Sequence, residues 1–198
     1  MGVGVTTGDY NITVGYQTGQ AITSGERNVL IGANAGDAIT TAEYCVAVGH
    51  GALSAEDAYG RTTAIGYKAL NVQNTGSVSY NVAVGYEAGL LVSTGIENTL
   101  IGGRAGDALT TGASNVAVGF GALSTEDTGG RNTAMGYRAL NSLNNDASSY
   151  NTAIGYDAGA NVSTGINNTL IGGLAGDALT TGEGSVAIGK SALSATTV

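Results

Sequence analysis

The chain has 198 residues, including 34 Gly, no Pro, no Trp and a single Phe, and its formal net charge is −8. This composition argues against a conventional globule with a bulky core, and it excludes collagen, which needs Pro and a Gly at every third position. Because the chain has no Lys/Arg cluster and no apolar run near ~20 residues, we expect neither nucleic-acid binding nor membrane insertion.

From the N-terminus onward, a glycine recurs at steps of 17 or 19 residues, each time after a short apolar segment such as NVAVG (81–85) or NTAMG (132–136). Four successive steps make a cassette of 70 residues, and 31 of 48 positions are identical between 81–128 and 151–198. The repeated glycines are Gly15, Gly32, Gly49, Gly66, Gly85, Gly102, Gly119, Gly136, Gly155, Gly172 and Gly189.

The whole chain, 1–198, is one repeat array built from these cassettes. A partial coil at 1–10 precedes a first cassette at 11–80, a second at 81–150 and a partial third at 151–198. The array starts and stops inside a cassette, which favours a piece of a longer fibre over a self-sufficient filament unit.

Each repeated segment has a fixed pattern of columns along the array. The position four before the glycine is Asn in eight of eleven coils. It is followed by a β-branched residue, then Ala or Leu apart from Thr13, then Val, Ile or Met. Such segments are typical of short β-strands, and 17 residues hold one coil of a solenoid but no crossover helix. The sequence therefore predicts an all-β β-solenoid of about eleven coils, ~50 Å long at ~4.8 Å per coil.

Alternation along a strand sends neighbouring side chains to opposite faces. In NVAVG the two Val columns share one face, and Asn, Ala and Gly share the other. We expect the Val/Ile/Thr face to fill the coil interior and the small Ala/Gly face to lie exposed, where another chain can approach it. Three copies around an axis would satisfy this face, and the residues alone leave a dimer or crossed packing open.

Several segments resemble a known repeat family. NVAVGFGAL (115–123) and SVAIGKSAL (185–193) resemble the YadA-like head repeats of trimeric autotransporter adhesins, and NTAIGYDAG (151–159) resembles related repeats of phage tail fibres and virion adhesins. The resemblance covers about residues 11–193. It implies a trimeric, left-handed β-roll on an extracellular fibre, on a virion or a bacterial cell surface, that attaches to a host cell. The coils here are longer than the usual ~14-residue head repeat, which favours the phage-like branch.

Tyrosines that follow the repeated glycine are the best candidates for recognition, because Tyr combines a flat apolar face with a polar tip. The alternative is that they cover the coil corners and stack on one another. These tyrosines are Tyr16, Tyr67, Tyr86, Tyr137 and Tyr156. The Asn column is expected to form a structural ladder or to satisfy the bends; its members include Asn81, Asn98, Asn115, Asn132, Asn151 and Asn168.

Recurrent carboxylates invite metal and catalytic interpretations, but we predict no metal, cofactor or catalytic residue. Asp37, Asp107 and Asp177 recur once per cassette and are interpreted as turn-capping residues, since the pattern of calcium-binding β-rolls is missing. The pairs Glu56-Asp57 and Glu126-Asp127 are interpreted as solvated loop residues.

The single histidine and the single cysteine carry no catalytic pattern. His50 stands in a column that holds Phe120 and Lys190 in later cassettes, and Cys45 replaces an Asn of the ladder column. A lone Cys rules out an intrachain disulfide, and we expect Cys45 to be a small residue without chemistry.

Three classes of function compete. The leading hypothesis is a non-catalytic structural or adhesive fibre segment, with a cell-surface glycan or protein receptor as its partner. An ice- or carbohydrate-binding solenoid is the alternative, although an ice-binding face needs a Thr ladder on every coil and the Thr pair of the AGDAxTT segment recurs once per cassette, at 40–41, 110–111 and 180–181. A polysaccharide-active enzyme needs an acid/base pair in a cleft, and the sequence contains no unrepeated carboxylate cluster.

Overall fold

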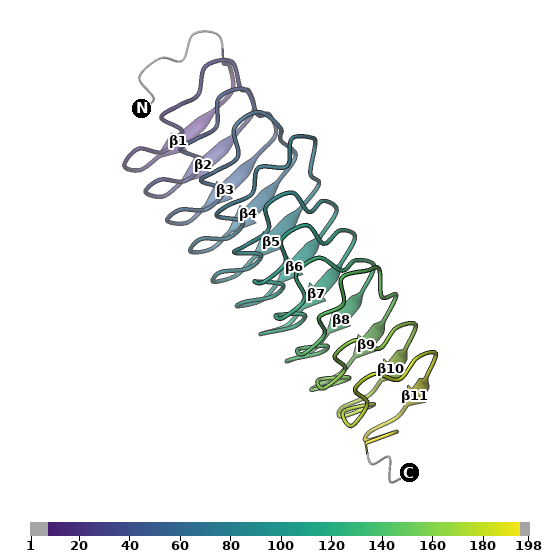
Figure 1. Cartoon of the computed structure of the whole chain (residues 1–198). Coiled ribbons are helices and arrows are strands. Elements are labelled where there is room, and N and C mark those ends of the chain that lie inside the picture. Colours follow the sequence, from purple (N-terminus) through teal and green to yellow (C-terminus); the bar gives the residue numbers. More distant parts are fainter. Residues whose placement is uncertain (1–7, 195–198) are drawn as a thin grey trace.

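Eleven short strands form one parallel sheet in which each strand pairs with its neighbour in the chain (Figure 1). The computed structural model describes residues 8–194, which contain no helix and hence no helix that could cross a membrane. The strands are β1 (Ile12–Val14), β2 (Val29–Ile31), β3 (Val46–Val48), β4 (Thr63–Ile65), β5 (Val82–Val84), β6 (Thr99–Ile101), β7 (Val116–Val118), β8 (Thr133–Met135), β9 (Thr152–Ile154), β10 (Thr169–Ile171) and β11 (Val186–Ile188).

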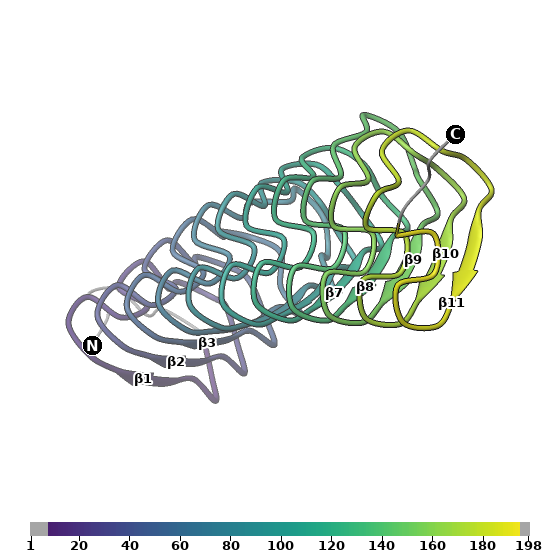
Figure 2. The ribbon, with the colours of Figure 1, turned by 90° about the horizontal axis from the view of Figure 1, so that it is seen from below.

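The coils stack in perfect register with the sequence repeat. Val82 of β5 pairs with Thr99 of β6, and Thr99 pairs with Val116 of β7, so that each column of the sequence becomes a ladder along the rod. Figure 2 shows the strands along one side of the rod and the loops returning around the other side. The predicted all-β β-solenoid is therefore confirmed.

The repeated glycines are required where each strand ends. Gly119 has a φ of 136°, and a Cβ at this position would lie 2.3 Å from the carbonyl oxygen of Gly136 in the next coil. A side chain would therefore meet both an unfavourable backbone conformation and the neighbouring backbone. The tight stacking of successive coils depends on this column.

The assignment of the two sheet faces from the sequence was wrong. The central residue of β2 to β11 points inward and is buried, as Leu100 and Ala117 illustrate, whereas the flanking Val, Ile and Thr residues point outward. The interior is too narrow for two β-branched columns, because it must also hold the buried Ala and Leu residues of the return loops. The inner face is the Asn/Ala/Leu face, and the outer face is the Val/Ile/Thr face.

Large and small residues alternate across the core so that its volume is filled. Where the central strand residue is Leu100, the facing loop position is Gly106, whose Cβ would lie 2.8 Å from a methyl carbon of Leu100. Where the strand residue is Ala117, the facing position is Leu123, and both side chains are fully buried. This exchange keeps the packing dense while the strand backbone stays the same.

Candidate functional site

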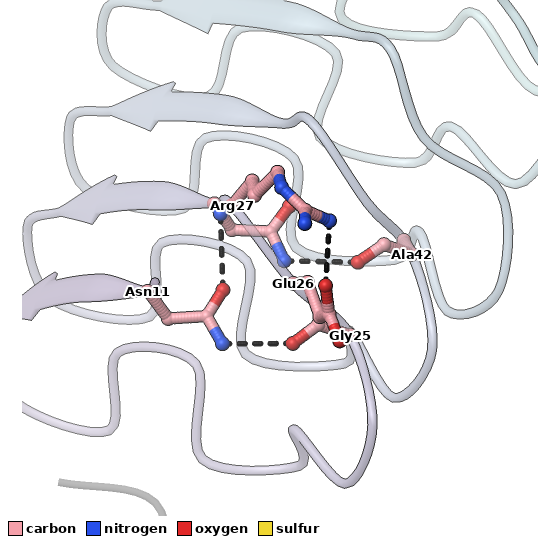
Figure 3. A network of polar contacts seen from close by, with 6 residues as sticks. Asn11, Gly25, Glu26, Arg27 and Ala42 are labelled. Atoms are coloured by element: carbon pink, nitrogen blue, oxygen red, sulfur yellow. Dashed lines mark hydrogen bonds and ion pairs between the residues drawn. The ribbon is translucent and has the colours of Figure 1, made fainter. Parts of the chain in front are cut away.

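The asparagine column forms a ladder of side-chain to backbone hydrogen bonds inside the rod. At its N-terminal end the Asn11 side chain donates to the carbonyl of Gly25 at 2.7 Å, and its Oδ1 accepts from the backbone N–H of Asn28 at 3.0 Å (Figure 3). The Asn28 side chain then donates to the carbonyl of Ala42 at 2.9 Å. Each Asn thus ties its own coil to the next one.

The same pattern runs through the predicted ladder residues. Oδ1 of Asn98 accepts from the backbone N–H of Asn115 at 3.0 Å, while its Nδ2 donates to the carbonyl of Gly112 at 2.9 Å. Asn81, Asn98, Asn115, Asn132, Asn151 and Asn168 are all buried. Because each amide satisfies one buried donor and one buried acceptor of the backbone, the ladder has a structural role.

The candidate recognition tyrosines lie in one aromatic column at the end of the strands. His50, Tyr67 and Tyr86 form one stack with centroid separations of 5.6 and 5.3 Å. A second stack joins Phe120, Tyr137 and Tyr156 with separations of 5.8 and 5.2 Å. The two stacks show that neighbouring rings in this column cover one another.

The rings nevertheless keep much of their surface in solvent. The exposed fraction of Tyr16, Tyr67, Tyr86, Tyr137 and Tyr156 lies between 40% and 71%. A hydrogen bond with Glu87 raises the pKa of the Tyr86 hydroxyl, and the nearby charge of Asp157 raises the pKa of Tyr156. The column is interrupted at Gly103, so that the two stacks are separated by one coil without a ring.

A second column of rings lies before the strands and combines with arginines. The Arg27 guanidinium lies 5.4 Å from the ring centroid of Tyr10 and 5.5 Å from that of Tyr44, and Arg61 lies 5.5 Å from Tyr44. These cation–π contacts are exposed. These contacts link neighbouring coils at the surface, and they engage each tyrosine ring with an arginine side chain.

Two glutamates expected in solvated loops are instead buried in the rod. Glu56 accepts hydrogen bonds from the Gln73 side chain and from the backbone N–H of Tyr59, both at 3.0 Å. Glu126 accepts from the backbone N–H groups of Gly129 at 2.8 Å and Asn145 at 3.2 Å. The donors satisfy the carboxylates, but burial raises the pKa of both. The loop interpretation fails because it treated each Glu-Asp pair as one unit, whereas only the Glu turns inward.

The recurrent aspartates lie in the turns after β2, β6 and β10. Burial raises the pKa of Asp37 and Asp107, and one carboxylate oxygen of Asp37, Asp107 and Asp177 is buried without a hydrogen-bond partner. Within residues 8–194, no group of three or more His, Cys, Asp or Glu side chains is arranged to hold a metal ion.

His50 lies in the aromatic column, and Cys45 lies in the asparagine ladder column. The His50 ring is the first member of the stack with Tyr67. Cys45 is fully buried, and desolvation raises the pKa of its thiol to about 12. Its sulfur lies 3.7 Å from the Glu43 carbonyl oxygen. With this raised pKa the thiol is protonated at neutral pH.

The outer face of the sheet carries continuous columns of partly exposed, mostly apolar residues. Its second column has exposed fractions of 39% at Ile101, 40% at Met135 and 37% at Ile154, and the fraction rises to 68% at Ile188 in the last described coil. The face repeats along all eleven strands, at ~4.8 Å per strand and ~3.3 Å per residue. Its geometric footprint is about 500 Å², within the range of the largest apolar patch on a typical monomer.

A recess beside Phe120 was not anticipated from the sequence. It lies between the turns that follow β6, β7 and β8. Its walls include Arg104, Asp107, Ser124 and Arg138. A signal was present, because Asp107, Ser124 and the Asn at 141 occupy one column in three successive coils, as do Asp37, Ser54 and Asn71.

No protein-family model, no curated protein and no solved structure matches the chain.

Proposed function

We propose that this chain is a non-catalytic structural and adhesive segment of a surface fibre, in which three copies pack through their outer sheet faces. The observation that carries the proposal is the outer face of Val, Ile and Thr, which continues along all eleven strands. A parallel sheet is normally covered on both faces, and here the described residues cover only the inner one.

The size of the outer face supports association between copies. Its footprint of about 500 Å² is more than half of the ~800 Å² per partner of a standard interface. A second copy has the same length and the same coil spacing, so that its ladder meets this face along the whole rod. No other partner is guaranteed to match that spacing.

The number of copies and the winding rest on the resemblance to adhesin repeats. A sheet only three residues wide presents a narrow strip, and three strips can close around an axis with their Val and Ile side chains in the centre. The proposed assembly is a homotrimer of left-handed β-rolls. It would lie outside the cell, on a virion tail fibre or on a bacterial surface, and it would attach to a glycan or protein receptor of the host cell.

Sedimentation equilibrium tests the assembly. We expect a mass three times that of the 19.4 kDa chain at micromolar concentration. The double variant Val84→Lys/Val118→Lys places charges on the outer face and should sediment as a monomer with an unchanged β-sheet spectrum. A matched control, Thr94→Lys/Thr125→Lys, adds the same charge at exposed loop positions and should remain a trimer. A monomeric parent chain would contradict the proposal.

Attachment is tested with the same three proteins. Fluorescently labelled parent chain and loop control should bind to a panel of bacterial cells, and the outer-face variant should bind far less because it loses multivalency. Equal binding of all three proteins would show that attachment does not depend on a fibre.

A further inference from the structure

The recess beside Phe120 is a built cavity of about 200 Å³, half open to solvent. It is hollow because Gly121 stands where the coils before and after it carry Arg104 and Arg138. A Cβ at residue 121 would lie 3.6 Å from Cγ of Arg138 and 3.9 Å from Oγ of Ser124. Any longer side chain at this position would therefore occupy the space.

Hydrogen-bond donors line two sides of the recess. Arg104 and Arg138 are about half exposed, and their Nε atoms face Glu87 at 3.2 Å and Asp157 at 4.0 Å. One terminal nitrogen of Arg138 also donates to Oδ1 of Asn141 at 3.5 Å. A guanidinium has five N–H donors, so that these contacts still leave N–H groups able to bind a ligand oxygen. The two arginines come from coils on either side of Gly121 and thus approach a ligand from opposite sides.

Asp107 contributes a carboxylate to the lining of the recess. Its Oδ1 is buried without a hydrogen-bond partner, as are the Oδ1 atoms of Asp37, Asp157 and Asp177 in other turns. A ligand hydroxyl in the recess would therefore donate to the other carboxylate oxygen of Asp107. Beside it, the Ser124 hydroxyl accepts from the Asn141 side chain at 2.6 Å and keeps its own proton to donate.

An apolar wall completes the recess. The Phe120 ring is 55% exposed, and one of its faces stacks on Tyr137. Gly103, the position where the aromatic column is interrupted, leaves room beside the ring: a Cβ there would lie 3.2 Å from the ring. The ring can therefore contact the C–H face of a ligand without moving its neighbours.

The local charge decides which ligand fits. Around the recess, the positive charges of Arg104 and Arg138 are outnumbered by the three carboxylates of Glu87, Asp107 and Asp157. A phosphate or an acidic sugar would bind the arginines but would also face Asp107. A neutral sugar is both donor and acceptor, and its ring carries an apolar face.

We propose that this recess binds one neutral hexopyranose unit of a cell-surface polysaccharide. Ring hydroxyls donate to Asp107 and accept from Arg104 and Arg138, while the C–H face of the sugar packs on Phe120. That the sugar comes from a cell-surface polysaccharide rests on the proposed attachment function. The binding site itself is formed by residues of one chain. In the first cassette, the same columns hold Asp37, His50, Gly51 and Ser54, with Asn34 and Lys68 in place of the two arginines, so that binding there should be weaker.

Saturation-transfer NMR with the full chain tests the site. The probes are the methyl glycosides of glucose, galactose and mannose, with glucuronate as the acidic comparison, at up to about 100 mM, well above the millimolar constants expected for a single small sugar. We expect at least one of the neutral glycosides to receive saturation, and Asp107→Asn to weaken its binding about tenfold or more. Phe120→Leu should weaken it as well, because the flat ring face is lost.

Asp146→Asn is the matched control, since it removes the same charge at an exposed position outside the recess and should bind like the parent. The proposal is overturned if no neutral glycoside receives saturation, if only glucuronate does, or if Asp107→Asn binds like the parent. The sedimentation mass of the same samples separates this failure from failure of the assembly: a monomer that binds sugar retains the site and loses the trimer.

Discussion

The two faces of the sheet are built from alternate residues of the same eleven strands, but they meet opposite environments. The inner face carries Asn, Ala and Leu, which are buried within one chain. The outer face carries the more hydrophobic Val, Ile and Thr, which one chain leaves half-buried or exposed. The comparison shows that in a narrow solenoid the width of the interior, and not hydrophobicity alone, decides which face is inside.

This difference implies two kinds of stability. Inner residues stabilise the fold of a single chain, whereas outer residues stabilise the assembly. Substitutions on the inner face should therefore lower the unfolding free energy at any protein concentration, and those on the outer face should act through association.

The largest effect is expected for Leu100→Ala on the inner face of β6. Leu100 is fully buried and fills the space left by Gly89 and Gly106 in the loops, so that no neighbour can close the cavity. We expect a loss of about 2–5 kcal/mol of unfolding free energy in chemical denaturation. The outer neighbour Ile101→Ala is the control, and its effect should depend on protein concentration. Equal, concentration-independent losses would remove the distinction between the faces.

A smaller loss is expected for Asn98→Ala in the ladder. The substitution leaves the backbone N–H of Asn115 and the carbonyl of Gly112 without their side-chain partner, at a cost of about 1–3 kcal/mol. Asn161→Ala removes an exposed side chain that donates to the Asp177 carbonyl at 2.6 Å, and it should cost clearly less. If both variants lose the same stability, the ladder does not act through burial.

The smallest effect is a pH dependence that arises inside the rod. Burial raises the pKa of Glu56 and Glu126, so that the folded chain holds these protons more tightly than the unfolded chain. The unfolding free energy should therefore rise as the pH is lowered from neutral toward the usual carboxyl range near ~4.3, and fall as the pH is raised. Denaturation at a series of pH values and one protein concentration measures this slope.

The double variant Glu56→Gln/Glu126→Gln should flatten that slope. Glu43→Gln/Glu183→Gln changes the same charge at exposed positions and should keep it. A slope that survives in the buried double variant, or that has the opposite sign in the parent, would show that the two buried glutamates do not govern it.

Much of the architecture could be predicted from the sequence, because spacing is a strong signal in a repeat. The 17- and 19-residue steps placed every strand between an Asn-column residue and a repeated glycine, as β6 between Asn98 and Gly102 illustrates. The faces could not be predicted in the same way. The pattern predicts an Asn ladder, but it places that ladder on the face expected to be exposed, although a buried backbone needs a side chain that both donates and accepts.

The recess could not be predicted because it depends on three coils at once. Gly121 creates the space, but Arg104 and Asp107 belong to the coil before and Arg138 to the coil after. A repeat motif read within one coil does not show which side chains of neighbouring coils converge. The exchange of Leu100 and Gly106 for Ala117 and Leu123 was visible in the sequence and would have identified the inner face.

Thiol labelling of Ile101→Cys tests the central claim, that the outer face lies between copies, most directly. Ile101 is 39% exposed in a single chain, whereas Cys45 is buried with a pKa raised to about 12 and should stay silent in the folded protein. Thr128→Cys, at an exposed loop position, is the reference for an accessible thiol. The account predicts that the Ile101→Cys thiol is protected in the native assembly and reacts once dilution or denaturant separates the chains. Labelling of Ile101→Cys as fast as Thr128→Cys in the native protein would contradict it.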